Sequence, residues 1–156
     1  MDFTQFWKEP ITPIGKELLK IRYKEGSPEL HQEDYGGCVD LYNYENVSLK
    51  KGDFKLIDLG VAMQLPQEYD AIIIPRSSTF KKYGLLLVNS PGYIDNSYNG
   101  SEDWWFAAVY ATRDIEIPKG TRCFQFRLIK TQPALHTVTS DTLGDVNRGG
   151  CGSSGD

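Results

Sequence analysis

The fold is decided by residues 71–88, which read AIIIPRSSTFKKYGLLLV. The apolar run from Ala71 to Ile74 stops at a proline, and short runs of this kind are typical of strands. Ser78 can cap a short helix over the next five residues and Gly84 can end it, because serine favours helix starts and glycine favours helix ends. A second strand, Leu85 to Val88, follows. The stretch predicts two strands joined by one short helix.

Five further segments have the same strand character, being short, rich in Val, Ile, Leu, Tyr and Phe, and bounded by Gly, Pro, Asn or Asp. Regular short strands separated by turn signals predict an all-β barrel or sandwich. The further strand segments are Leu18 to Tyr23, Cys38 to Tyr42, Phe54 to Met63, Trp104 to Thr112 and Cys123 to Thr131.

The chain of 156 residues fits one domain with a real core. We expect an N-terminal extension over residues 1–17, a single β domain over 18–140, and a mobile Gly- and Ser-rich arm over 141–156, which has too few apolar residues to order itself. Residues 1–10 lack the basic start and the apolar stretch that are typical of a signal peptide, and no apolar run approaches the roughly 20 residues of a membrane helix. We therefore expect a cytoplasmic protein without a membrane partner.

Charge and cysteine content exclude two classes of function. The formal net charge is -4, which disfavours a nucleic-acid-binding surface because phosphate neutralisation needs clustered Lys and Arg. A nucleotide that brings its own Mg²⁺ remains allowed. Three cysteines, an odd number without a CxxC pair, and two histidines without ligand-like spacing make a zinc site or a disulfide framework improbable.

Pro75-Arg76-Ser77-Ser78 is the first candidate for chemistry, because it follows a buried strand and opens a helix. Backbone N–H groups at a helix start attract anions, and hydroxyl and guanidinium groups add donors that suit phosphate. The alternative is an ordinary helix cap beside a structural ion pair.

Residues 88–100 form the second candidate and resemble a β-hairpin. Asn89 can present both a donor and an acceptor to a pyrimidine edge. Asp95 can hold a sugar hydroxyl and a water molecule, and Tyr98 offers a flat face for a sugar ring. The alternative is a polar hairpin that uses Asn, Gly and Asp for their turn conformations alone.

The tail from Arg148 to Gly155 is the third candidate. Its glycines allow close backbone approach, and successive N–H groups can form an anion-binding nest beside Arg148, Ser153 and Ser154. Its spacing is not that of a Walker loop. The alternative is a disordered terminus.

In their order along the chain, these motifs resemble the five motifs of the trimeric dUTPase family, from about Gly36 to Gly155. The resemblance implies a jelly-roll or β-barrel homotrimer with shared active sites. It also implies Mg²⁺-assisted hydrolysis of dUTP to dUMP and pyrophosphate, by in-line attack of water on the α-phosphate. This reaction keeps uracil out of DNA and supplies dUMP for dTMP synthesis. The matching segments are Gly37-Cys38-Val39-Asp40-Leu41, Pro75-Arg76-Ser77-Ser78, Gly92 to Gly100, Gly120-Thr121-Arg122-Cys123-Phe124-Gln125, and Arg148 to Gly155.

The resemblance also assigns roles to single residues. Asp95 would bind the 3′-hydroxyl and then deprotonate the attacking water, and Asp40 would lie in the outer shell of Mg²⁺ through water. The remaining roles concern substrate binding: uracil would be read by Asn89, Gly92 and Ile94, deoxyribose by Tyr98, and phosphate oxygens by Ser77, Ser78, Gln125, Arg148, Ser153 and Ser154, with Arg76 as support.

The chain departs from the family pattern at three places. Cys151 stands where the fifth motif carries the aromatic residue that stacks on the base, and this motif is about two residues shorter. We therefore expect the lid over uracil to come from Trp104, Trp105 or Phe106. Asn99 replaces a common basic residue, and Val39 replaces the usual aromatic of the first motif.

Two other functions compete with dUTP hydrolysis. A dCTP deaminase shares the fold and an Arg-Ser-Ser motif, but it needs a glutamate after the hairpin, where this chain has Trp105; Glu102 lies nearby in a turn. A binding module would use nucleotide only as a switch, with Phe3, Phe6 and Trp7 as a docking place for a protein partner.

Overall fold

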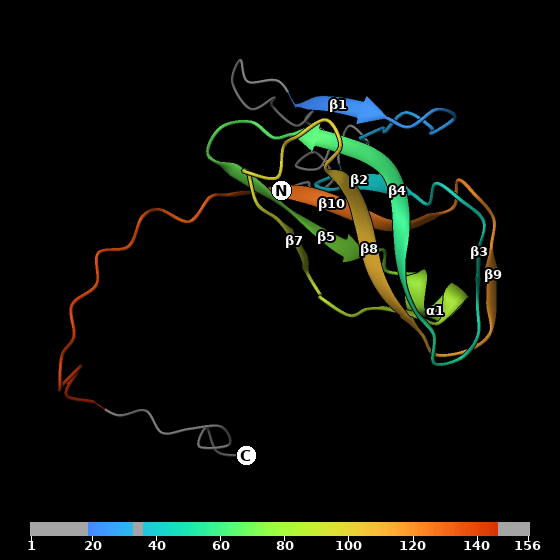
Figure 1. The fold of residues 1–156 in the computed structure, drawn as a ribbon. Helices are drawn as coiled ribbons and strands as arrows, with labels where there is room; N and C mark the ends of the chain where they lie inside the picture. The colour runs from blue at the N-terminus through green and yellow to red at the C-terminus, as the bar shows by residue number, and fades with distance from the viewer. Residues whose placement is uncertain (1–18, 33–35, 147–156) are drawn as a thin grey trace, which may run out of the picture.

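Two four-stranded antiparallel sheets and a two-stranded ribbon make up the domain (Figure 1). The computed structural model describes residues 19–32 and 36–146. The first sheet has the order β1 (Lys20–Tyr23), β4 (Phe54–Gln64), β8 (Trp104–Ala111) and β6 (Leu85–Leu87). The second has the order β2 (Val39–Tyr42), β10 (Arg122–Lys130), β5 (Tyr69–Pro75) and β7 (Gly92–Ile94). The ribbon pairs β3 (Val47–Leu49) with β9 (Ile115–Ile117). The predicted all-β fold is confirmed.

One buried cluster joins the two large sheets. Along β8, side chains alternate between the core and the solvent, as the two-residue period of a strand requires. Trp105 is fully buried and meets Phe126 of β10 edge to face, with ring centroids 5.3 Å apart and planes at 85°. This aromatic pair therefore links the sheets at the centre of the core.

The helix α1 (Thr79–Tyr83) is the only helix within the described ranges, as the sequence predicts. Gly84 adopts the left-handed conformation, with φ at 62°, and its N–H donates to the Phe80 carbonyl at 2.7 Å. Ser78 occupies the N-cap position, but its side chain makes no capping hydrogen bond, so the predicted side-chain cap is wrong. The buried Thr79 hydroxyl instead donates to the Cys123 carbonyl and holds the helix against β10.

The predicted hairpin over residues 88–100 is also wrong. β6 pairs with β8 in one sheet, whereas β7 pairs with β5 in the other, so the segment between them crosses from sheet to sheet. β7 lies beside β5 with Ala71 opposite Ile94 and Ile73 opposite Gly92. Non-local pairing with β5 decides this arrangement, and a local pattern of turn residues does not reveal it. The short strands β3, β7 and β9 were not predicted either.

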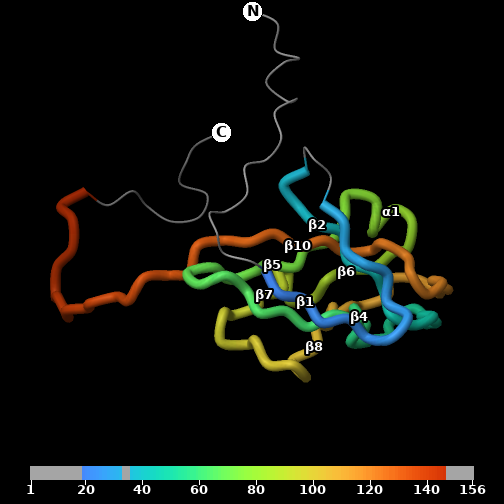
Figure 2. The backbone as a smooth tube through the Cα atoms, turned by 90° about the horizontal axis from the view of Figure 1, so that it is seen from above, coloured from blue at the N-terminus to red at the C-terminus, as the bar shows by residue number. Residues whose placement is uncertain are grey.

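After β10 the chain leaves the domain (Figure 2). The last backbone hydrogen bond to the domain joins the Thr131 N–H to the Glu68 carbonyl at 2.9 Å, and residues 131–146 are exposed throughout. The last strand and the last of these backbone hydrogen bonds thus lie before the predicted domain boundary at 140, which stays a prediction. None of the described helices is long and apolar enough to cross a membrane.

The outer face of the β1-β4-β8-β6 sheet carries large apolar side chains that are 40–61% exposed. Tyr110 of β8 lies opposite Phe54 on one side and Leu86 on the other, so several of these side chains are direct neighbours. A contiguous patch of this kind commonly marks a surface that another molecule covers. The patch comprises Phe54, Leu56, Leu86, Val88, Phe106 and Tyr110.

Replacing the core tryptophan tests this description of the fold. Trp105→Ala should lower the free energy of unfolding by about 3–5 kcal/mol, because it removes a fully buried ring and leaves a cavity. Phe106→Ala, one residue along and 40% exposed, should cost about 1 kcal/mol or less. Urea unfolding followed by circular dichroism measures both. Equal losses in the two variants would contradict the assignment of Trp105 to the core.

Candidate functional site

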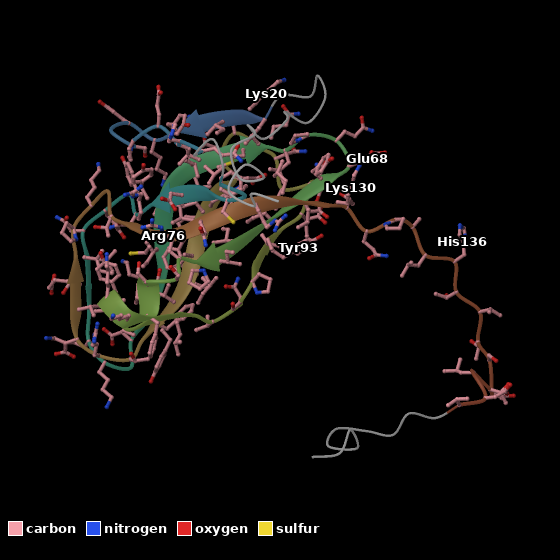
Figure 3. The ribbon with its side chains drawn as sticks, turned by 180° about the vertical axis from the view of Figure 1, so that it is seen from behind. Lys20, Glu68, Arg76, Tyr93, Lys130 and His136 are labelled. Atoms are coloured by element: carbon pink, nitrogen blue, oxygen red, sulfur yellow. The ribbon has the colours of Figure 1, made fainter. Side chains whose placement is uncertain are left out.

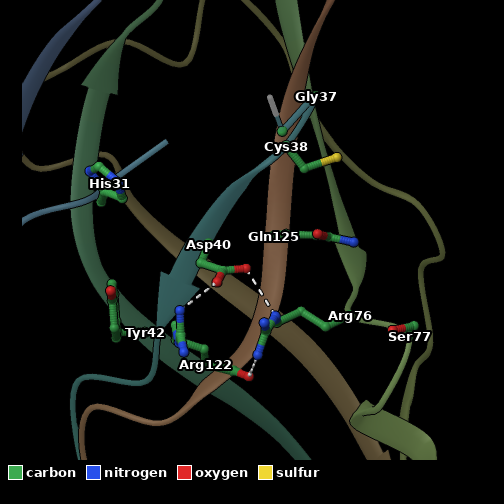
Figure 4. A pocket seen from close by; sticks show the side chains of 10 residues that line it. His31, Gly37, Cys38, Asp40, Tyr42, Arg76, Ser77, Arg122 and Gln125 are labelled. Carbon is green, nitrogen blue, oxygen red and sulfur yellow. Dashed lines mark hydrogen bonds and ion pairs between the residues drawn. The ribbon is translucent and has the colours of Figure 1, made fainter. Parts of the chain in front are cut away.

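The first of two hollows, about 410 Å³ in volume, lies where β2, β10 and the end of β5 meet (Figure 4). Asp40 of β2 and Gln125 of β10 are register partners, and Gln125 also faces Ile74 of β5. Arg76 and Ser77 follow directly after β5. Residues from three of the predicted motifs therefore meet in one place.

Asp40 holds two guanidinium groups at the centre of this hollow. Its Oδ1 lies 2.9 Å from Arg76 Nε, and its Oδ2 lies 3.1 Å from Arg122 Nη1 (Figure 4). Arg76 also donates to the Arg122 carbonyl at 3.3 Å. With two arginines around one aspartate, the cluster carries a net positive charge, which suits an anion.

Sequence reasoning did not name Arg122, which the structure places in the candidate site. It lies in the segment Gly120 to Gln125 that resembles the fourth motif, and a basic residue three positions before Gln125 was a usable signal. A bulge in β10 between Arg122 and Phe124 shifts the register there. The guanidinium of Arg122 therefore reaches Asp40 on the neighbouring strand. A strand pairing extrapolated without the bulge would not predict this contact.

The hydroxyl and amide donors are distributed unevenly around the hollow. Ser77 is exposed and lines it, whereas Ser78 is half-buried and does not. Gln125 lines it and donates from Nε2 to the Pro75 carbonyl at 3.3 Å. The hollow therefore offers side-chain donors from Ser77, Gln125 and Arg122 to a ligand.

The donor set does not form a protein-held metal site. No group of three or more His, Cys, Asp or Glu side chains that could hold a metal ion occurs within residues 19–32 and 36–146. Asp40 is a lone carboxylate with both oxygens already paired, although a carboxylate keeps further lone-pair positions. Such a group fits contact with a hydrated ion through water and does not fit a complete inner shell.

The second hollow, about 450 Å³, lies beside β7 and the start of β8. Asp95 follows β7 directly and is exposed in this hollow. Its Oδ1 accepts hydrogen bonds from the Ser97 hydroxyl and from the Ser97 N–H, the latter at 2.8 Å. These two donors hold the pKa of Asp95 below the ordinary aspartate value, and the hydroxyl has the larger effect. Asp95 is therefore ionised at neutral pH.

Tyr98 stands next to Asp95 in the same hollow. Its N–H donates to the Asp95 carbonyl at 2.9 Å, and its hydroxyl donates to the Trp104 carbonyl at 3.0 Å. The ring is thus held at both ends and is 39% exposed. Burial, and then the charge of Asp103, raise the pKa of Tyr98, so its hydroxyl stays protonated.

The three aromatic residues predicted as a lid differ in what they can cover. Trp105 is fully buried in the core and cannot lie over a ligand, so this prediction is wrong. The Trp104 ring already lies against Arg22 and Lys24, at 5.0 and 4.9 Å from its centroid, and its Nε1–H donates to Glu102 at 3.1 Å. Phe106 is 40% exposed and lines the hollow, and Lys24 Nζ lies 5.9 Å from its ring centroid, farther than from that of Trp104.

Asn89 and Gly92 lie together but outside the lining of the second hollow. Asn89 is exposed in the turn before β7. A Cβ added at Gly92 would meet Ile73 Cβ at 3.4 Å and Asn89 Nδ2 at 3.6 Å, so the amide rests against the backbone of β7. Ile94 lines the hollow beside Asp95. The predicted base-reading residues are therefore neighbours along one edge of β7.

The two hollows share no residue and lie toward opposite ends of β5. Ala71, the partner of Ile94, precedes Arg76 by five residues, which at about 3.3 Å per residue is roughly 17 Å. Figure 3 shows Arg76 and Tyr93 well apart, with Tyr93 toward the end that carries Glu68 and Lys130. The predicted tail residues Arg148, Ser153 and Ser154 lie outside the described residues.

A comparison with protein families matches residues 31–155 to the dUTPase family. A prophage-derived relative, deoxyuridine 5′-triphosphate nucleotidohydrolase YosS of Bacillus subtilis, is 46% identical over 88% of this chain and 97% of its own length. The deoxyuridine 5′-triphosphate nucleotidohydrolase of Rickettsia prowazekii is 36% identical over 93% of this chain and 99% of its own.

Solved structures share the fold at lower identity. The dUTPase of Staphylococcus bacteriophage 80alpha, solved with dUPNHPP, superposes with a TM-score of 0.75 at 19% identity, covering 88% of this chain and 98% of its own. The dUTPase of phage phi11 of S. aureus, described with a structural Mg(II) ion, superposes with a TM-score of 0.69 at 17% identity. The match covers 80% of this chain and 98% of the phage chain.

Removing one hydroxyl tests the environment of Asp95. Ser97→Ala deletes the larger of the two causes that lower the pKa of Asp95, so this pKa should rise toward the ordinary value. Carboxyl ¹³C NMR titration measures the shift. Ser101→Ala, whose hydroxyl bonds to none of the described residues, is the matched control and should leave the pKa of Asp95 unchanged. A titration of Asp95 that is identical in Ser97→Ala and wild type would rule out this hydrogen bond.

Proposed function

This chain belongs to the dUTPase family, and on that premise we propose that it hydrolyses dUTP to dUMP and pyrophosphate with Asp95 as the general base. The observation that carries the assignment is the arrangement of Asp95 in the second hollow. Ser97 occupies Oδ1, whereas no described residue donates to Oδ2. One oxygen therefore fixes the side chain and the other is left for a water molecule.

The proposed reaction is in-line attack of water on the α-phosphorus. A bond forms between the water oxygen and this phosphorus while the bond to the bridging oxygen of the β-phosphate breaks, and the water proton passes to Asp95. Asp95 is ionised at neutral pH and can accept this proton, and its lowered pKa makes it a weaker base than an ordinary aspartate. A positioned general base typically contributes about 10²–10⁴-fold to the rate.

The sugar and base would bind along β7. Tyr98, whose ring is held by its hydrogen bond to the Trp104 carbonyl, would pack under the deoxyribose and exclude a 2′-hydroxyl. Asn89, with the backbone of Gly92 and Ile94, would read uracil. Phe106 remains the best placed of the predicted lid residues.

The phosphates would bind in the first hollow. Ser77 and Gln125 line it and would donate to phosphate oxygens, with Ser78 next to them. Arg76 and Arg122, both anchored on Asp40, would supply positive charge. Asp40 would meet a hydrated Mg²⁺ through water. Bound Mg²⁺ would offset negative charge on the phosphates and on the departing pyrophosphate.

The distance between the hollows supports a homotrimer with shared sites. The α-phosphorus of a nucleotide is joined to the sugar through a single oxygen, so the groups that hold sugar and phosphate must lie close together. In one chain the two sets lie roughly 17 Å apart along β5. Each site would therefore combine the second hollow of one copy with the first hollow of another. The residues of the apolar patch that do not line the second hollow, Phe54, Leu56, Leu86, Val88 and Tyr110, offer a surface for such assembly.

The exposed chain after β10 supports the same arrangement. It leaves its own domain after Thr131 and is exposed from residue 131 to residue 146, so this part of the chain is available for contact with a neighbouring copy. Arg148, Ser153 and Ser154 would then close over the β- and γ-phosphates of the shared site.

The contacts of Glu102 disfavour the competing deaminase function. Its side chain is exposed and paired with Arg22, and it also accepts from Trp104 Nε1. The hydrogen bond from Arg22, and next the one from Trp104, lower the pKa of Glu102. A surface carboxylate held ionised in this way is poorly suited to carry a proton to an exocyclic amine.

Replacing the proposed base tests this function. Asp95→Asn should lower kcat for pyrophosphate release from dUTP by about 10²–10⁴-fold, because the amide cannot accept the water proton. Binding of a non-hydrolysable imido analogue of dUTP, followed by calorimetry, should persist.

Asp103→Asn is the matched control from the same loop. Asp103 accepts from the Gly100 N–H at 2.7 Å, and the amide oxygen of asparagine can keep this bond, so the activity should be unchanged. Wild-type turnover by Asp95→Asn would remove Asp95 as the base.

A further inference from the structure

Asp70, at the start of β5, is a buried carboxylate outside both hollows. It is 1% exposed, and Ile129 of β10 lies opposite it in the second sheet. A buried carboxylate is costly unless hydrogen-bond donors satisfy it. The hydrogen-bond donors to Asp70 therefore indicate which part of the chain this carboxylate fixes in place.

Both oxygens of Asp70 hold the segment that carries Asp95. Oδ2 accepts from the Tyr93 hydroxyl, and Oδ1 accepts from the Asn96 N–H at 2.8 Å. Tyr93 precedes Asp95 by two residues and Asn96 follows it. Asp70 thus holds the chain on both sides of Asp95 with charge-assisted hydrogen bonds.

Asn96 adds a second attachment. Its Nδ2 donates to the Pro66 carbonyl at 2.9 Å, in the connection before β5, and to the carbonyl of Tyr69, the first residue of β5, at 2.7 Å. Strand pairing between β5 and β7 extends only to Ile94, opposite Ala71. From Asp95 onward, Asp70 and Asn96 replace strand pairing as the link to β5.

We infer that Asp70 is a positioning residue for the hydrolytic reaction, acting through Tyr93 and Asn96 to aim the free Oδ2 of Asp95 at the attacking water. The inference rests on the proposed role of Asp95 as the base. Asp70 is buried and does not line the hollow, so it does not touch the substrate itself. An error of about 1 Å in the placement of a reacting group can cost on the order of 10²-fold in rate.

Tyr93→Phe is the mildest test, because it deletes one hydroxyl from a side chain that is 52% exposed (Figure 3). We expect kcat for dUTP to fall about tenfold, since one hydrogen bond that restrains the loop is lost. Tyr44→Phe is the matched control: it deletes a hydroxyl that donates to the Glu25 carbonyl at 3.0 Å, away from Asp95, and should leave kcat unchanged.

Two substitutions at Asp70 complete the series. Asp70→Ala removes both contacts and should lower kcat by on the order of 10²-fold. Asp70→Asn should recover much of that loss, because its amide oxygen can accept from the Asn96 N–H while its NH₂ donates to the Tyr93 hydroxyl. If Asp70→Ala does not fold, Tyr93→Phe and Asp70→Asn carry the test.

Binding stoichiometry separates positioning from a merely structural role. The imido analogue of dUTP should bind every variant at full stoichiometry, with nearly the wild-type Kd, while the single-turnover rate falls. A loss of kcat that only follows a loss of binding-competent protein would overturn the inference, and so would wild-type kcat in both Tyr93→Phe and Asp70→Ala. Activity retained by Asp95→Asn would instead refute the proposed base, so the two failures are distinguishable.

Discussion

The pairing of β5 with β10 on one side and with β7 on the other is the constraint on which both hollows depend. At one end of β5, Arg76 and Ser77 join Asp40 and Gln125 from the neighbouring strands. At the other end, β7 holds Asp95. A shift of one residue in either pairing would turn the inward side chains outward, because side chains alternate along a strand. The same register therefore fixes the core and both halves of the site.

Much of the fold was predictable because its signals are local. Short β-branched runs bounded by turns gave seven strands, and Gly84 ended the helix as expected. The path of residues 88–100 was not predictable, because it depends on pairing between β7 and a strand more than 15 residues earlier. In the run Trp104-Trp105-Phe106, side chains alternate between the two faces of the strand, so the buried ring depends on which face meets the core. Three consecutive aromatic residues do not indicate which face that is.

The residues of the candidate site were predictable where a motif carries its own chemistry and not where long-range geometry brings them together. Asp95, Tyr98, Asp40 and Gln125 came from motifs. Arg122 reaches Asp40 past a bulge, and Asp70 gains its contacts only when β7 lies against β5. The chain is negative overall, yet two arginines outweigh Asp40 in the first hollow. In the second hollow, the hydrogen bonds from Ser97 lower the pKa of Asp95.

The central claim is that the two hollows act together only across copies of the chain. Subunit mixing tests it most directly: an Asp95→Asn chain is unfolded and refolded together with an equal amount of a Ser77→Ala/Gln125→Ala chain, each nearly inactive alone. Shared sites predict recovery of roughly a quarter of wild-type turnover, because half of the chains carry each intact hollow. No recovery in mixed oligomers of confirmed composition would show that each chain builds its site alone and would contradict the account.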